Sequence, residues 1–361
     1  MPIVVDRTTL WDRSAYGGHS EGAVTGPAST WYLAEGSTAG RFDLFYLLEN
    51  PNSTIVDATV RWMKPPPLAP VVHTYALPPL SRTTLYVDQA DVRLASADVA
   101  AVVQATQPIF VERAMYWSRP SEPFAAGHGA SGVVAPATRW YLAEGATGNF
   151  FETFLLLLNP TGSPAECTVR YLLTNGNVLL KSYQLPPESR TTIWADVEEF
   201  AGVGRALANA SFATDVTVDN AVPIVVERAM WWPDGDWRES HASAGATAPA
   251  ERWAFADGDN VSALTYVLLA NTSTTPGEAR VTLFFEDGSS VQALVPIGAQ
   301  RRVTIDTRAL FPISSGRRFG GLVEALGSTP PALVVERVTY WNAEGVFWSG
   351  GTGALASPLP F

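Results

Sequence analysis

The chain contains short apolar segments and segments in which apolar and polar residues alternate, and it has no long stretch with a helical period. In residues 138–250, the run 151–158 is strongly apolar, as in a buried strand, whereas residues 167–173 alternate and place Cys167 on the same face as Val169 and Tyr171. Asn175-Gly176 is a hairpin signal. These patterns and the turn residues between them predict seven strands, at 140–144, 151–158, 167–173, 178–185, 190–194, 213–218 and 224–232. Seven short strands at this spacing favour a sandwich of two antiparallel sheets.

The same pattern occurs three times. Trp-Tyr-Leu-Ala-Glu-Gly at 31–36 recurs at 140–145, and a diverged copy, Trp-Ala-Phe-Ala-Asp-Gly, lies at 253–258. A period near 110 residues corresponds to a whole domain rather than to a solenoid or propeller unit. We therefore expect an all-β protein of three tandem immunoglobulin-like sandwiches, at 29–137, 138–250 and 251–361. Linkers rich in Gly, Ala, Pro and Ser, such as 118–138, are expected to join them.

A second motif occurs four times, once more than the domains. It consists of Val, an acid and Arg, with Trp five residues after the acid, and its copies start at Val5, Val111, Val226 and Val335. Residues 2–11 thus copy the last strand of a repeat, and residues 1–28 are expected to hold this orphan strand and a linker. Its unpaired backbone groups should find a sheet edge, in its own chain or in a neighbouring copy of the chain.

Composition narrows the classes of partner. Of the 361 residues 47% are hydrophobic, which suffices for several cores, and only 16% are charged. The net charge of −11 disfavours nucleic acid and anionic membranes. No apolar run reaches the roughly 18 residues that insertion into a membrane requires, and no signal peptide follows Met1. The single cysteine, Cys167, stands where the other copies have Ala58 and Ala279, which indicates a small buried residue.

The phrases Trp-Tyr-Leu-Ala-Glu-Gly and Val-Glu-Arg-Ala-Met-Tyr-Trp (111–117) resemble a repeat of large secreted or surface proteins of environmental bacteria. The resemblance covers nearly the whole chain. It implies an immunoglobulin-like accessory region at an extracellular or cell-surface location. It supplies no catalytic residues.

Three of the four histidines have a repeated position. His19, His128 and His241 each precede a repeat tryptophan (Trp31, Trp140 and Trp253) by 12 residues, and the last linker has Thr352 instead. We expect each imidazole to bond a backbone carbonyl or a motif carboxylate and, with the tryptophan, to fix a junction between domains. A metal site would need further ligands, and no cluster of His and Cys supplies them.

The repeated acids and arginines predict structural ion pairs. Neighbouring residues of a strand point to opposite faces, so Glu112 and Arg113 do not face each other. The expected partners lie on another strand, since buried charges persist when they are paired. The three predicted pairs are Glu112–Arg82, Glu227–Arg190 and Glu336–Arg301.

Catalysis is the least favoured class. A glycoside hydrolase needs two carboxylates about 5–9 Å apart, and Glu35 with Glu112 or Glu144 with Glu227 are candidates. Their recurrence in each copy favours a structural role, however, and no nucleophile elbow, phosphate loop or zinc signature is present. The acidic turns 234–236 and 257–260 do not fit a full calcium loop, and no cofactor is expected.

Two functions stay open. One is a non-enzymatic structural or adhesive array that spaces, displays or joins surface components. The other is a carbohydrate-binding module in which exposed aromatic rings stack on a surface polysaccharide. Its candidate rings are Trp62, Trp194, Trp231 and Trp237, which the shared motifs do not all require.

Overall fold

The computed structural model describes residues 3–11, 16–120, 122–233, 235, 237–343 and 345–360. Within these ranges the chain is all-β, with antiparallel strands and five helical segments of three or four residues. Pro2 of the predicted orphan strand, and Asp234 and Asp236 of the acidic turn 234–236, lie outside the described residues. No described helix has the length and apolarity needed to cross a membrane.

Three repeated units follow an N-terminal hairpin. The hairpin pairs β1 (Asp6–Trp11) with β2 (Gly17–Gly22). Unit 1 contains β3 (Ala28–Leu33), β4 (Phe42–Asn50), β5 (Val56–Met63), β6 (Val71–Leu77), β7 (Ser81–Tyr86), α1 (Val87–Ala90), η1 (Val92–Leu94), β8 (Ala100–Arg119) and β9 (Glu122–Ser131). Unit 2 contains β10 (Arg139–Leu142), β11 (Glu152–Asn159), β12 (Ala165–Leu173), β13 (Val178–Leu185), β14 (Ser189–Trp194), η2 (Ala195–Val197), β15 (Phe212–Val218), β16 (Val225–Trp232) and β17 (Glu239–Ala244). Unit 3 contains β18 (Arg252–Asp259), β19 (Ala263–Asn271), β20 (Gly277–Phe285), β21 (Ser290–Ile297), β22 (Arg301–Asp306), α2 (Thr307–Leu310), η3 (Pro312–Ser314), β23 (Arg318–Leu326), β24 (Leu333–Ala343), β25 (Val346–Leu355) and β26 (Ser357–Pro358).

Each unit has two antiparallel sheets. In unit 2 the strand orders are β10-β15-β12-β13 and β14-β11-β16-β17, and unit 3 repeats them with β26 added to the first sheet. In unit 1 the long strand β8 belongs to both sheets. The seven strands predicted in unit 2 are confirmed to within two residues at each end, because their alternation and turns are encoded locally.

The expected linkers instead contain an additional strand. Within 118–138 the structure forms β9, and β17 and β25 occupy the corresponding places in units 2 and 3. Glycine, alanine and serine have low strand propensity, so these segments have the composition of loops. Tertiary packing makes them strands, because each pairs with the preceding strand of its unit and contacts neighbouring segments of the same kind.

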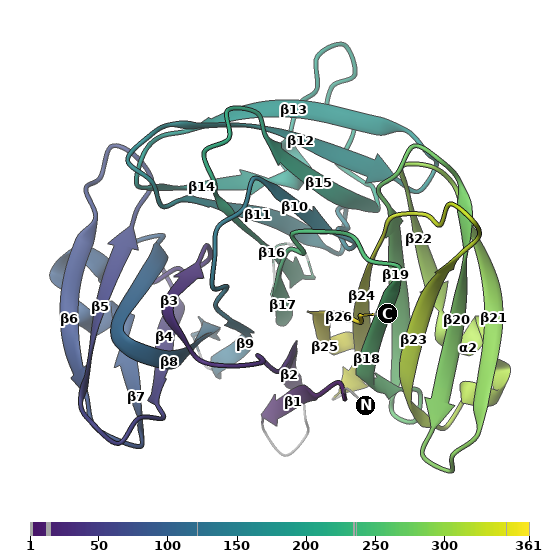
Figure 1. Cartoon of the computed structure of the whole chain (residues 1–361), viewed down its shortest axis with the longest axis horizontal. Helices are drawn as coiled ribbons and strands as arrows, with labels where there is room; N and C mark the ends of the chain where they lie inside the picture. Colours follow the sequence, from purple (N-terminus) through teal and green to yellow (C-terminus); the bar gives the residue numbers. More distant parts are fainter. Residues whose placement is uncertain are drawn as a thin grey trace.

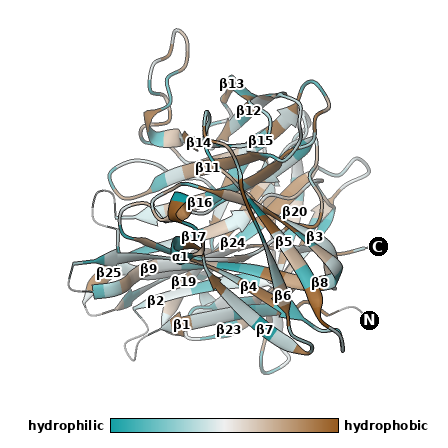
Figure 2. Cartoon of the chain, turned by 90° about the vertical axis from the view of Figure 1, so that its left-hand side faces the viewer, coloured by the Kyte–Doolittle hydropathy of each residue, from teal (hydrophilic) through white to brown (hydrophobic). Residues whose placement is uncertain are grey.

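The units form a closed ring rather than an extended row (Figure 1). The strands β2, β9, β17 and β25, here called the central strands, contact one another around one axis, and the side view draws them next to one another as well (Figure 2). The sheet that contains each central strand radiates from the axis, in the manner of a four-bladed propeller. Three sectors hold complete units, and the described part of the fourth sector holds the β1–β2 hairpin.

The hydrophobic cores continue across the unit boundaries. Buried residues of units 1 and 2 form a single cluster, and Leu172 and Trp232 of unit 2 pack into the core of unit 3. The ring is therefore one packed body. The predicted orphan strand pairs with β2 of its own chain, from Asp6 opposite Gly22 to Trp11 opposite Gly17.

Candidate functional site at the ring axis

The ring axis is built from backbone and very small side chains. The residues at one level of the four central strands are Gly18, Gly127, Ser240 and Gly351, each opposite an equivalent residue of its neighbouring strand. A Cβ atom on Gly129 of β9 would lie 2.8 Å from the ring of His19 on β2, and one on Gly353 of β25 would lie 2.9 Å from the ring of His241 on β17, closer than packing allows. Small residues are thus a steric requirement of the closed ring.

A buried arginine joins each pair of neighbouring units. Arg113 of unit 1 donates from Nη2 to Glu35 Oε2 (2.9 Å) in its own unit and from Nη1 to Glu227 Oε2 (2.7 Å) in unit 2. The other oxygen of Glu227 accepts the amide of Ala34 at 2.6 Å. Burial alone would raise the pKa of Glu35, but His128 and Arg113 beside it lower that pKa to about 2. The glutamate and the arginine of one repeated motif therefore bind at two different junctions: Glu227 contacts unit 1, and Arg228 contacts unit 3.

The second junction repeats the first. Arg228 lies 2.5 Å from Glu336 of unit 3 and 3.2 Å from Glu144 of its own unit, and Glu336 accepts the amide of Ala143 at 2.8 Å. All these side chains are buried.

The hairpin closes the ring with related contacts, although Arg7 is half exposed where Arg113 and Arg228 are buried. Asp6 accepts the amide of Ala256 of unit 3 at 2.8 Å, and Arg7 donates to Glu112 of unit 1 at 2.9 Å. Arg337 of unit 3 donates to Ser20 of the hairpin at 3.1 Å. The fourth copy of the motif thus occupies the fourth junction position, between units 3 and 1.

The predicted partners of the motif acids are wrong. Glu227 pairs with Arg113 instead of Arg190, Glu336 with Arg228 instead of Arg301, and Glu112 with Arg7 instead of Arg82. The reason is topological: in the order β7-β4-β8 the strand β4 separates Arg82 from Glu112, and the outer face of each motif strand meets a neighbouring unit.

The second set of arginines also belongs to the junctions. Strand pairing places Arg82 opposite Glu49, Arg190 opposite Leu158 and Arg302 opposite Ala270. Arg302, not Arg301, is therefore the counterpart of Arg190. Arg190 lies 3.4 Å from Asp98 of unit 1, and Arg302 donates to the carbonyl of Gly145 of unit 2. Both are buried, whereas Arg82 is exposed.

The three histidines lie buried on the central strands. Nε2 of His128 is 3.4 Å from Glu35 Oε2, and Nε2 of His241 is 3.4 Å from Glu144 Oε2, so each approaches the motif carboxylate of its own unit. His19 packs over Gly129 of β9. Burial, with Arg7 and His128 nearby, lowers the pKa of His19 to about 4, and burial also lowers the pKa of His241.

Sequence reasoning missed Glu239, which occurs in one copy only. The Glu239 carboxylate is buried and accepts the amides of Gly18 (2.8 Å), Gly127 (3.3 Å) and Ser240 (2.9 Å), which lie on three central strands. Burial raises its pKa well above the usual value although the three amides act in the opposite direction. The available signal was an acid two residues before the recurrent histidine, where the other copies have Gly17, Ala126 and Gly350.

The repeat tryptophans bind their own units. Nε1 of Trp31 donates to the carbonyls of Ala28 and Ile109, Trp140 to those of Ala137 and Ile224, and Trp253 to those of Ala250 and Leu333. Each indole ties the segment entering a unit to the last part of that unit. The three tryptophans also line a cavity at the axis.

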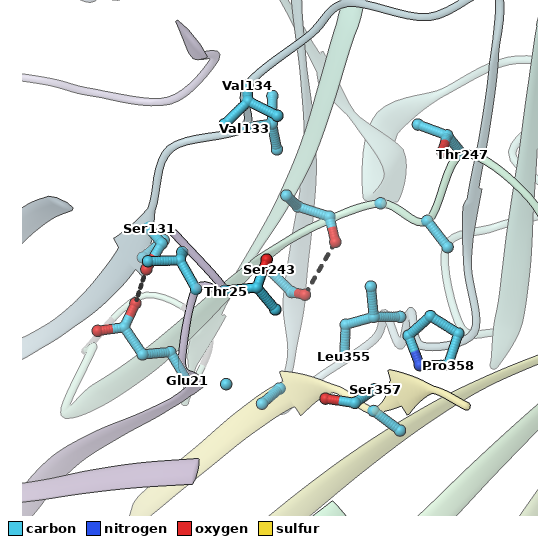
Figure 3. A pocket seen from close by; sticks show the side chains of 18 of the residues that line it. Glu21, Thr25, Ser131, Val133, Val134, Ser243, Thr247, Leu355, Ser357 and Pro358 are labelled. Atoms are coloured by element: carbon cyan, nitrogen blue, oxygen red, sulfur yellow. Dashed lines mark hydrogen bonds between the residues drawn. The ribbon is translucent and has the colours of Figure 1, made fainter. Parts of the chain in front are cut away.

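This cavity of about 760 Å³ opens where the chain leaves the central strands. Its walls are residues 20–26, 130–135, 242–250 and 354–358. Figure 3 shows its polar corner, where Ser131 donates to Glu21 at 2.9 Å. Among the described residues that line the cavity, Glu21 is the only one with an ionisable side chain.

The four candidate sugar-binding tryptophans do not form an exposed row. Trp62 and Trp231 are buried in the cores, which corrects their assignment as binding residues. Trp194 is 41% exposed and stacks on Phe154, and Trp237 is half-buried between Trp231 and Trp117. Trp231 and Trp237 instead pack against aromatic rings of unit 1 and fill the junction between units 1 and 2.

The other candidate chemistry is also structural. Cys167 is buried opposite Tyr183, as Ala58 is opposite Tyr75, and burial raises the pKa of its thiol to about 12. In the turn 257–260, Asp259 accepts the amide of Val261. Over the described residues no cluster of three or more His, Cys, Asp or Glu is arranged to hold a metal ion.

Comparison with known proteins finds no matching family model and no matching curated protein. Three solved structures are similar to parts of the chain. Thermotoga maritima 1070 is 13% identical over 31% of this chain and 97% of its own (TM-score 0.28). The Anabaena sensory rhodopsin transducer is 16% identical over 25% and 97% (TM-score 0.22), and the major pilin of Streptococcus pyogenes is 8% identical over 87% and 98% (TM-score 0.16). Likenesses this weak carry no argument about this chain.

Replacing Arg228 with alanine should lower the free energy of unfolding by about 3–5 kcal/mol, because Glu144 and Glu336 would stay buried without their cation. Urea denaturation measures the loss. Arg82→Ala is the control, since this exposed arginine should change stability by no more than about 0.5 kcal/mol. Equal losses in both variants would contradict the junction role of Arg228.

Removing the Glu239 carboxylate by Glu239→Ala should cost about 1–3 kcal/mol for each buried amide left without an acceptor. Glu166→Ala, at an exposed position of β12, is the control. Since the pKa of Glu239 is raised in the folded state, its contribution to stability is greatest below about pH 4.5 and declines as pH rises. The loss on substitution should therefore be larger at pH 5 than at pH 8, and a loss that grows with pH would refute this account.

Acid should destabilise the ring through His19. With a folded-state pKa of about 4 against an ordinary 6.5, the protein loses up to about 1.4 kcal/mol per pH unit as pH falls through this interval. His19→Thr, which introduces the residue found at Thr352, should lose less stability between pH 7 and pH 5. Identical pH profiles of the two proteins, measured by denaturation, would contradict the prediction.

Proposed function

We propose that this chain is a non-enzymatic structural protein that acts as one rigid ring and holds the outer faces of its units at fixed angles. The observation that carries the proposal is that the recurrent charged residues pair with one another across the boundaries between units. Glu35, Arg113 and Glu227, with their counterparts in the next junction, are buried and bonded to one another.

The same observation disfavours catalysis by these residues. Two carboxylates do approach a common point at each junction, but an arginine lies between them and solvent does not reach them. A hydrolase needs its two carboxylates on either side of a bound substrate. The acids serve to join units instead.

The proposal includes a location and a finer fold class. The resemblance of the motifs to repeats of bacterial surface proteins supports an extracellular or surface ring that displays or joins other components. The two antiparallel sheets of each unit support an immunoglobulin-like class, although β11 lies between β14 and β16, an order that differs from the immunoglobulin constant domain. Because Trp194 is exposed, weak binding of a surface polysaccharide at this ring remains part of the proposal.

Small-angle scattering and denaturation of the full chain test the ring. A compact body of this length should have a radius of gyration of about 21 Å and should unfold in one transition, because its cores cross the boundaries. Polysaccharides incubated with the chain should release no reducing ends. A larger radius typical of a row of domains, separate transitions of the units, or turnover abolished by Glu144→Gln would each overturn the proposal.

A further inference from the structure

The described residues place only two strands, β1 and β2, in the fourth sector of the ring. In units 1 to 3 the motif strand (β8, β16 or β24) has a central strand on one side and β4, β11 or β19 on the other. In the fourth sector the motif strand is β1, which pairs with the central strand β2. Among the described residues no strand pairs with the other edge of β1.

That edge has free backbone groups in a known register. The amide of Ala23 donates to the carbonyl of Val5, so Val5, and with it Arg7 and Thr9, direct their backbone groups toward β2. Asp6, Thr8 and Leu10 alternate with them and direct theirs to the open edge. At the same position of unit 1, Glu112 is opposite Leu47 of β4.

Two apolar side chains in and beside β1 are more exposed than their counterparts in the three units. Val5 is 51% exposed, whereas Val111, Val226 and Val335 are buried. Leu10 is 52% exposed, whereas its counterparts Trp231 and Tyr340 are buried and Tyr116 is half-buried. A strand with an open edge and exposed apolar side chains beside it is a template for the addition of another strand.

The neighbouring surface of unit 1 is incomplete at the same place. The side chain of Glu112 is 32% exposed, against 1% for Glu227. Glu227 and Glu336 accept the amides of Ala34 and Ala143, and no described residue offers such an amide to Glu112. Arg82 is exposed, whereas Arg190 and Arg302 lie buried against the preceding unit.

We propose that the open edge of β1 binds an extended segment from outside residues 1–361 that has the pattern shared by β4, β11 and β19. This pattern is an aromatic residue, an apolar residue, two leucines, one further residue and asparagine, as in 45–50, 154–159 and 266–271. The segment adds to the sheet antiparallel to β1, and the chain supplying it offers a backbone amide to Glu112. This interaction is separate from the structural role of the ring.

The probe is a labelled peptide with the sequence of residues 42–50, added to the full chain. Pairing of β4 with β8 places the residue equivalent to Leu47 opposite Asp6. Fluorescence anisotropy should show saturable binding, and hydrogen–deuterium exchange should slow in β1. A peptide with Leu47→Pro should bind with an affinity at least about tenfold lower, because it lacks a backbone amide that would hydrogen-bond to β1.

A chain variant gives the reciprocal control. Leu10→Pro removes an amide that points to the open edge, so the variant should stay folded and bind the peptide more weakly, whereas Leu10→Ala retains binding. If the Leu10→Pro variant does not fold, the comparison of the Leu47→Pro peptide with the unchanged peptide tests the proposal by itself. Equal binding of both peptides, unchanged exchange in β1, or a dimer of the chain that protects β1 without peptide would overturn the proposal.

Discussion

Each of the two junctions between complete units depends on a buried guanidinium shared by carboxylates of both units. A buried arginine is stable only when its charge is matched and its N–H groups find acceptors, and no single unit supplies enough of either. Arg113 therefore needs Glu35 from its own unit and Glu227 from the next. The arginine of one unit binds the motif glutamate of the next unit, so these contacts continue around the axis from unit to unit.

The axis imposes the complementary constraint. Four central strands can approach one another only if their residues are small, and this composition leaves few side chains to bury apolar area. Packing across the boundaries and the charged junctions stabilise the centre instead, together with Glu239, which accepts amides from three of the four strands. Among the described residues the carboxylate has no cationic hydrogen-bond partner. The three amides offset only part of its desolvation, so its pKa stays well above the usual value.

The N-terminal hairpin explains why four copies of one motif accompany three units. Asp6 and Arg7 make the contacts that close the ring between units 3 and 1. The hairpin therefore supplies the two strands of a unit that the axis requires, and it leaves open the outer edge that a complete unit would cover. Exposure of Val5, Leu10, Glu112 and Arg82 at one place follows from this single difference.

The sequence by itself determined the all-β class, the three copies, the seven strands of unit 2 and the buried place of Cys167, because alternation, turn residues and repetition are local properties of the chain. It also singled out the residues of the junctions, since His128, Glu227 and Arg190 recur in a common pattern. Only the tertiary structure decided their partners. The acid and the arginine of one motif point to opposite faces of a strand, so Glu227 meets Arg113 of the preceding unit, a contact that depends on how whole units pack. The same holds for β9, β17 and β25, whose glycine-rich segments become strands through packing at the axis rather than through their own propensity.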